Sequence, residues 1–261
     1  MDAPLDLLPL WAILLGTLLI VLLSLECGYR LGRLRRRRSE QEKEAPVGAM
    51  AGATLGLLAF LLAFTFGLAA TRFDARRQVL LDEANAIGTC YLRAGLISEP
   101  HGSEVRKLLR EYVDVRLEVA RTKDNLNQAM RRSAELHGLL WAHAVAVGQS
   151  SPNSVVVALF ISSLNDVIDL HAKRLMVGLR SRIPPIIWVT LYAISILAFA
   201  AMGYHGGLAG TSRSLVIFAI ALTFSAVLWL IADLDRPREG WLRVNQQPMV
   251  DLRNSMNEPS G

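Results

Sequence analysis

The sequence predicts an all-α membrane protein with four transmembrane helices and a four-helix polar domain between the second and the third. The 261 residues are 52% hydrophobic and 20% charged, which is typical of an integral membrane protein with a substantial polar part. Four runs are apolar and long enough to cross a bilayer core, which takes about 20 residues. No segment alternates apolar and polar residues in the manner of a half-buried strand.

The first apolar run extends from Leu10 to Leu25 and is rich in leucine and isoleucine. The residues before it, Met1 to Pro9, include no basic side chain, and no small-residue cleavage site precedes Glu26. The run therefore lacks the features of a signal peptide, and we interpret it as a retained first span.

An arginine-rich segment, Arg30 to Val47, follows this span. Its basic residues are Arg30, Arg33, Arg35, Arg36, Arg37, Arg38 and Lys43. Short basic loops stay on the cytoplasmic side, so this segment favours a polar domain outside the cytoplasm. The net charge of +5 comes partly from this cluster, which indicates lipid headgroups rather than nucleic acid as partners.

The second span lies in a stretch without charged residues, between Ala45 and Thr71. Phe60 and Phe64 are four residues apart and therefore share one face. Small residues recur at spacings of three and four on a neighbouring face, namely Gly52, Gly56, Ala59, Ala63 and Gly67. Such a stripe permits close helix packing. The spacing alone leaves two alternatives for the phenylalanines, which can pack against lipid or core, or face a central axis.

The polar domain is predicted to contain four amphipathic helices with short breaks between them. Apolar residues recur at spacings of three and four over Phe73 to Ile97, Glu104 to about Lys123, Asn125 to Ala146 and Ser154 to Leu179. Ser103 is suited to cap the second of these helices.

The third and fourth spans are predicted at Ile183 to Met202 and Leu215 to Ala232. Proline is tolerated at a helix start, as at Pro184 and Pro185, and Pro237 prevents smooth continuation of the last span. The predicted domains are residues 1–70 (two spans with the basic loop), 71–182 (polar helical domain), 183–235 (two spans) and 236–261 (polar tail). We expect the end of the tail, Asn245 to Gly261, to fray or to wrap a neighbouring subunit.

Three charged residues, Asp233, Asp235 and Arg236, close the fourth span. The preferred interpretation is a surface ion pair between Asp235 and Arg236 that contributes little to stability. The alternative is a functional one, in which Asp233 and Asp235 bind a cation or hold the tail against a neighbouring subunit.

No pattern predicts an enzyme, a cofactor or a metal centre. The sequence has no Walker-type or dinucleotide-binding glycine loop, no HExxH, no CxxC and no nucleophile elbow. His137 and His143 are six residues apart and fall on different faces of a helix, which makes them poor joint ligands.

One weaker metal hypothesis involves Asp166 and Asp169, which share a helix face beside His171. Together with Glu83 or Asn85 they could bind Ca²⁺ or Mg²⁺ through oxygen ligands. The preferred interpretation is that these carboxylates form a solvated face or pair with arginine.

Several motifs resemble a known family. The pattern Phe60, Phe64, Thr71, Arg72 and Phe73 is similar to the second transmembrane helix of the bestrophin channels, where two phenylalanines four apart lie in the pore neck. Further similar motifs are Arg72 to Arg77, Asp82 to Gly88, Asn165 to His171, Arg182 to Pro185 and Asp233 to Pro237. The chain is identified as a member of the bacterial bestrophin-like domain family over nearly its whole length.

The resemblance implies a homo-oligomeric ion channel, with five copies as in bestrophins, whose second span lines the pore. The implied pore-lining residues are Phe60, Phe64, Gly67, Thr71 and Arg72, and the vestibule or selectivity candidates are Asp82, Glu83 and Asn85. Hydrophobic constrictions gate by dewetting, and charges at the mouths select ions. Arg72 and the arginine-rich segment would concentrate anions, whereas rings of Asp82 or Glu83 in the vestibule would favour cations. Bestrophin relatives conduct chloride or bicarbonate and some bacterial ones conduct cations, and we slightly favour anions such as chloride.

The implied partners are further copies of the chain, membrane lipids and inorganic ions, and the implied location is the bacterial inner membrane. Bestrophins keep their helical domain in the cytoplasm, opposite to the side that the basic loop favours. No acidic calcium clasp follows the fourth span, so calcium activation is not implied. The alternative function is a non-conducting membrane sensor or scaffold, in which the helical domain binds a partner protein.

Overall fold

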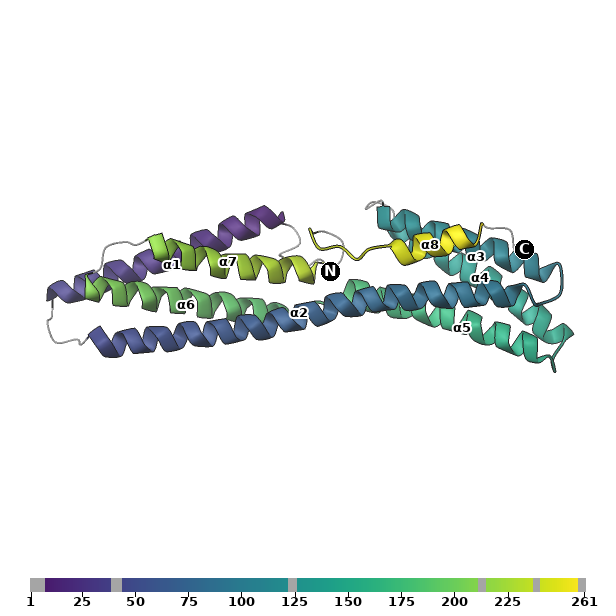
Figure 1. Ribbon diagram of the computed structural model, residues 1–261, viewed down its shortest axis with the longest axis horizontal. Coiled ribbons are helices and arrows are strands. Elements are labelled where there is room, and N and C mark those ends of the chain that lie inside the picture. Colours follow the sequence, from purple (N-terminus) through teal and green to yellow (C-terminus); the bar gives the residue numbers. More distant parts are fainter. Residues whose placement is uncertain (1–7, 39–43, 122–125, 211–214, 237–239, 258–261) are drawn as a thin grey trace. The chain divides into compact units, whose positions relative to one another are not determined.

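The computed structural model describes residues 8–38, 44–121, 126–210, 215–236 and 240–257 (Figure 1). Within these ranges every regular element is helical and no strand occurs. The elements are α1 (Leu10–Arg38), α2 (Glu44–Ala94), α3 (His101–Arg121), α4 (Leu126–Ser150), α5 (Val155–Leu175), a π-helical turn (Met176–Arg180), α6 (Pro185–Ala209), α7 (Leu215–Asp235) and α8 (Gln247–Ser255). The predicted all-helical class is confirmed.

The chain forms two compact units. Unit 1 comprises residues 1–73 and 182–243, and unit 2 comprises residues 74–181 and 244–261. Helix α2 contributes to both, because its residues up to Phe73 belong to unit 1 and those from Asp74 to unit 2.

Among the described residues, five helices, rather than the four predicted, are long and apolar enough to cross a membrane. They lie within Leu10–Arg38, Pro46–Ala94, Val155–Gly178, Pro185–Ala209 and Leu215–Asp235. The additional one is α5, which sequence analysis assigned to the polar domain. The prediction of an all-helical membrane protein is therefore confirmed. The number of membrane spans does not follow from the length and composition of the helices.

Unit 1 contains α1, the first part of α2, α6 and α7. Helix α1 packs against both α6 and α7, and the shared core includes Leu58 and Leu62 of α2, Leu191 and Phe199 of α6, and Leu228 of α7. Helix α1 does not end with the apolar run at Leu25 but continues to Arg38. Arginine is a strong helix former, and positive charge at a helix C-terminus complements the helix dipole, so the basic cluster extends the helix.

The crossing of α1 and α6 depends on four glycines. A Cβ at Gly28 or Gly32 of α1 would overlap the backbone of Ala200 or Tyr204, and a Cβ at Gly203 or Gly207 of α6 would overlap the backbone of α1. Both pairs are spaced by four residues, as in small-xxx-small membrane packing. The small residues predicted to pack closely include Gly52, Gly56 and Gly67, yet no described atom beyond the adjoining backbone of α2 lies within 4 Å of such a Cβ at these three positions.

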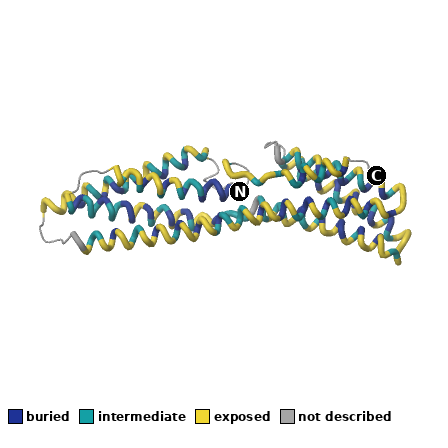
Figure 2. Tube along the Cα trace, in the orientation of Figure 1, coloured by how far each residue is buried: buried dark blue, intermediate teal, exposed yellow. Residues whose placement is uncertain are grey.

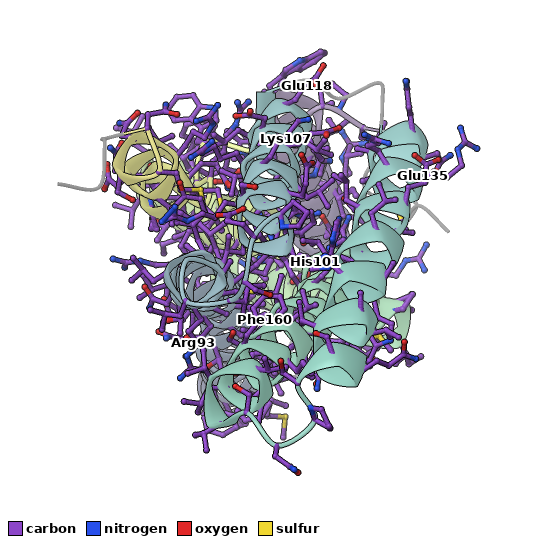
Figure 3. All side chains as sticks on the ribbon, turned by 90° about the vertical axis from the view of Figure 1, so that its right-hand side faces the viewer. Arg93, His101, Lys107, Glu118, Glu135 and Phe160 are labelled. Atoms are coloured by element: carbon purple, nitrogen blue, oxygen red, sulfur yellow. The ribbon has the colours of Figure 1, made fainter. Side chains whose placement is uncertain are left out.

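Unit 2 surrounds its own core with α3, α4, α5, α8 and the second part of α2. Its fully buried side chains include Ile87 of α2, Leu109 of α3, Leu140 of α4, Phe160 of α5 and Met249 of α8. Figure 3 views this unit from the end at which α3 begins, with Phe160 inside the bundle.

The C-terminal segment differs from the prediction of a fraying or neighbour-binding tail. Helix α8 packs against α3 of the same chain, and Met249 of α8 and Met256 directly after it are buried. Arg253 donates to both carboxylate oxygens of Asp114, at 2.5 and 3.0 Å, and the Tyr91 hydroxyl donates to the Met256 carbonyl at 3.1 Å. The two methionines supply the apolar area that the tail needs for docking.

The helix boundaries of unit 2 also differ in detail. Helix α3 begins at His101, so Ser103 lies within the first turn, where its hydroxyl donates to Glu99 at 2.6 Å. Ser154 does cap α5, since its hydroxyl accepts a hydrogen bond from the Val157 amide at 3.3 Å. Helix α4 continues to Ser150. The predicted end of the second helix at Lys123 and the predicted start of the third at Asn125 lie outside the described residues.

Candidate functional site

Helix α2 buries only one side within unit 1. The buried positions recur at helical spacing and are Ala51, Leu58, Leu62, Thr65 and Ala69. A step of two residues rotates about 200° around a helix axis, so Phe60 and Phe64 lie opposite Leu58 and Leu62. Their side chains are 67% and 68% exposed, and Figure 2 shows exposed residues recurring along this helix. We call this exposed side of α2, which carries Phe60, Phe64, Gly67 and Thr71, the open face. It is the candidate functional surface.

The open face combines bulky aromatics with small residues. Gly52, Gly56 and Gly67 lie in open space within the chain, and Gly67 and Thr71 continue the line of Phe60 and Phe64. The Thr71 hydroxyl donates to the Gly67 carbonyl at 2.9 Å, so its hydrogen bond is formed within α2 itself. Such a surface accommodates lipid chains or a second helix equally well by shape.

Arg72 ends the charge-free stretch of α2. It is half-buried, and its Nη1 atom is buried without a hydrogen-bond partner among the described residues. Phe73, the next residue, packs against the core of unit 1. One guanidinium nitrogen of Arg72 is thus buried without a hydrogen bond from the described residues.

The three vestibule candidates belong to unit 2 and differ from one another. Asp82 is half-buried and accepts a hydrogen bond from Gln78 at 2.9 Å, and Asn85 is exposed. Glu83 has no exposed surface. A carboxylate that is sealed inside the bundle cannot line a water-filled vestibule, so the prediction for Glu83 does not fit its position in the chain.

Glu83 is instead the centre of a buried polar cluster. Its Oε1 accepts a hydrogen bond from the Tyr112 hydroxyl at 2.9 Å and lies 3.3 Å from Nε of Arg116, and its Oε2 accepts from Nη1 of Arg174. Arg174 also donates to the side chain of Gln246 at 3.2 Å. One buried carboxylate therefore faces two guanidinium groups, which offset its desolvation cost.

Two histidines border this cluster. Nδ1 of His171 lies 2.9 Å from the Tyr112 hydroxyl, and the rings of His137 and His171 meet edge-on with centroids 4.9 Å apart. Because Tyr112 donates to Glu83, His171 must supply the proton of their shared hydrogen bond. Burial and the nearby Glu83 carboxylate raise the pKa of Tyr112 well above its usual value. Burial and the Arg116 charge lower the pKa of His137.

The structure does not assemble the acidic metal site considered from the sequence. Asp166 and Asp169 are exposed on α5, whereas His171 is buried against Tyr112, and Glu83 is committed to arginines. No group of three or more potential metal ligands occurs among the described residues. His137 and His143 make separate contacts, as their spacing predicted.

Comparison with known proteins identifies the family. A profile described as the bestrophin-like domain matches residues 11–249. The chain belongs to the bestrophin-like domain family. No curated protein sequence matches it.

Solved structures resemble this bestrophin-like chain in fold. A crystal structure of a bacterial bestrophin homolog from Klebsiella pneumoniae carrying one substitution has a TM-score of 0.63 at 15% identity, with 94% of each chain covered. A second variant of that homolog has a TM-score of 0.64 at 14% identity, covering 95% of this chain and 96% of the other. A crystal structure of a membrane protein has a TM-score of 0.62 at 15% identity and covers 95% of both.

The end of α7 in this bestrophin-like chain is more buried than predicted. Asp233, Asp235 and Arg236 are 1%, 5% and 5% exposed, so their predicted location at the surface is wrong. Asp233 accepts hydrogen bonds from the backbone amides of Trp241 and Leu242 at 2.9 and 3.0 Å.

The neighbouring carboxylate, Asp235, accepts a hydrogen bond from the Ile183 amide at 2.9 Å and lies 3.8 Å from Nη1 of Arg182. The two carboxylates thus hold the segments that enter α6 and leave α7. A sequence signal exists in hindsight: acidic residues directly after an apolar span can accept free amides of the adjoining loops.

Proposed function

We propose that this bestrophin-like protein is a homo-oligomeric ion channel of five copies in a bacterial inner membrane, with α2 lining the pore. The single observation that carries the proposal is the open face of α2. Phe60 and Phe64 are exposed on the side of α2 that lies opposite the hydrophobic core of unit 1. When several copies surround one axis, this face is the part of α2 that remains to enclose a passage.

Phe60 and Phe64 would form two aromatic rings one helical turn apart along the pore. Rings of this kind narrow a pore and gate it by dewetting. The edges of aromatic rings carry partial positive charge, so they tolerate a partly dehydrated anion. Gly67 and Thr71 continue the same line toward Arg72 and supply a wider, more polar segment beyond the constriction.

The charges near the pore ends favour anions. Arg72 is half-buried at the end of the charge-free stretch of α2, and the arginines at the end of α1 are exposed. Positive charge at a pore mouth concentrates anions. Glu83 contributes no compensating ring, because Arg116 and Arg174 neutralise it inside unit 2. Asp82 and Asn85 remain candidates to line a vestibule, where the Asp82 carboxylate would reduce the preference for anions.

Four of the five apolar helices would span the membrane in this arrangement, namely α1, the first part of α2, α6 and α7. Helix α5 would remain outside the bilayer. Its apolar residues Val157, Phe160 and Leu164 are buried within unit 2, whereas Asp166 and Asp169 are exposed. Exposed carboxylates are costly in hydrocarbon, which argues against lipid around α5.

Ion flux from liposomes containing the purified protein tests the proposal. We expect flux with a chloride gradient to exceed flux with a sodium gradient, and Phe64→Ala to increase it. Phe66→Ala is the matched control, since Phe66 lies on a neighbouring face of α2 and is only 38% exposed. Absence of flux from a folded oligomer would contradict the channel and favour a membrane scaffold whose helical unit binds a partner.

The oligomeric state gives an independent test. We expect native mass spectrometry in mild detergent to give a single species of five copies. A monodisperse monomer would contradict the pore, because one copy of α2 encloses no passage.

A further inference from the structure

A second histidine pair lies in unit 2, apart from the Glu83 cluster. His101 is the first residue of α3, and His143 lies in α4, which packs against α3. Their Nδ1 atoms are 3.0 Å apart, and the rings meet at 70° with centroids 5.3 Å apart. Both side chains are half-buried, and Figure 3 labels His101 where α3 begins.

The separation of the two nitrogens matches that of neighbouring ligands on one metal ion. Imidazole nitrogens bind zinc at about 2.0–2.1 Å. Two such ligands are about 2.9 Å apart at a right angle and about 3.4 Å apart at the tetrahedral angle. The observed 3.0 Å lies between these values. Imidazole is a preferred ligand of zinc, copper and nickel.

The protonation chemistry also suits a cation. Two protonated imidazoles would direct N–H groups at each other, so the close approach of the Nδ1 atoms requires at least one free lone pair. Among the described residues, the two imidazoles form hydrogen bonds only with each other. The nearby Glu99 carboxylate accepts from the Ser103 amide and hydroxyl, at 3.2 and 2.6 Å. Water would therefore complete the coordination.

We propose that His101 and His143 form a reversible two-histidine site for a divalent transition-metal ion, either zinc or copper, which links the start of α3 to α4. Two protein ligands make a weaker site than the four of a structural zinc centre. The ion is therefore an exchangeable ligand rather than a resident cofactor. This site does not depend on ion conduction.

Thermal unfolding of the purified full-length protein, with and without zinc chloride, tests the site. Zinc that binds the folded state raises the unfolding midpoint by mass action, here by about 2–4 °C at saturating concentration. Magnesium should have no effect, because it prefers oxygen ligands. His101→Gln and His143→Gln should each abolish the zinc shift, whereas His205→Gln, in unit 1, should retain it.

Carbethoxylation of histidines in the wild-type protein, mapped by mass spectrometry, provides a test that needs no variant. Zinc should protect His101 and His143 and leave His205 unchanged. The proposal is overturned if zinc produces neither a midpoint shift nor protection in the wild type, or if the shift persists in both glutamine variants.

Discussion

Tyr112 on α3 donates a 2.9 Å hydrogen bond to Glu83 on α2, and neither side chain has any exposed surface. The bond joins two helices through groups that would be costly to bury apart. Arg116 and Arg174 complete the arrangement from α3 and α5. The polar centre of unit 2 therefore depends on one carboxylate.

We first predict that Glu83→Gln destabilises the protein by about 3–5 kcal/mol, because it leaves two guanidinium groups inside the bundle without a counter-charge. Asp82→Asn is the matched control, since Asp82 is half-buried and accepts a hydrogen bond from Gln78, one helical turn away. Its cost should stay below about 0.5 kcal/mol. Chemical unfolding of the full-length protein in detergent measures both, and equal effects would refute the assignment.

Second, acid should destabilise the protein through His137. Its ring packs against those of Tyr112 and His171, and it lies near the charges of Arg116 and Glu83. The folded protein lowers the pKa of His137 from 6.5, so the unfolded chain binds the proton more readily. The stabilising contribution is therefore fully present above pH 6.5, declines as pH falls below that value, and levels off below the folded-state pKa.

The difference between the wild type and His137→Gln isolates this contribution from those of other titrating groups. We expect the unfolding midpoint of the wild type to fall by about 2–4 °C more than that of the variant between pH 7.5 and 5.5. Parallel pH profiles for the two proteins would exclude His137 as the source.

Third, Gly203→Ala should disrupt the crossing of α1 and α6. The added methyl group would overlap the backbone of Leu25 and Tyr29, and such overpacking costs about 1–3 kcal/mol. Gly16→Ala is the matched control in α1, because no atom lies within 4 Å of its new Cβ. Yield of monodisperse protein and the unfolding midpoint should fall for the first variant only. A tolerated Gly203→Ala would mean that the helices are farther apart.

Fourth, Asp233→Ala should loosen the segment after α7. The substitution removes the acceptor of the Trp241 and Leu242 amides, at a cost of about 1–3 kcal/mol. We expect faster cleavage near Trp241 in limited proteolysis. Asp251→Ala, an exposed position on α8, should leave that cleavage unchanged. Equal rates for the wild type and both variants would contradict the role of Asp233 in holding this segment.

Helical class and the positions of the apolar helices were predictable because both depend on local properties. An apolar run of sufficient length must be helical in a bilayer, since each backbone group needs a partner within its own segment. The facing of Phe60 and Phe64 on one side of α2 likewise followed from a spacing of four. The extra apolar helix, α5, was less clear, because a helix buried in a bundle and a helix in lipid have similar composition.

The tertiary structure alone decided which of these local features are buried and what they meet. Sequence grouped Glu83 with Asp82 and Asn85, yet only Glu83 turns into the core, where residues 29 and 91 positions away along the chain bind it. The sequence pattern also predicted close packing at glycines of α2, whereas Gly28 of α1 and Gly203 of α6 permit the close crossing of these two helices. His101 and His143 meet across 42 residues. Such pairings depend on how helices pack together, and periodicity within one helix carries no information about its neighbour.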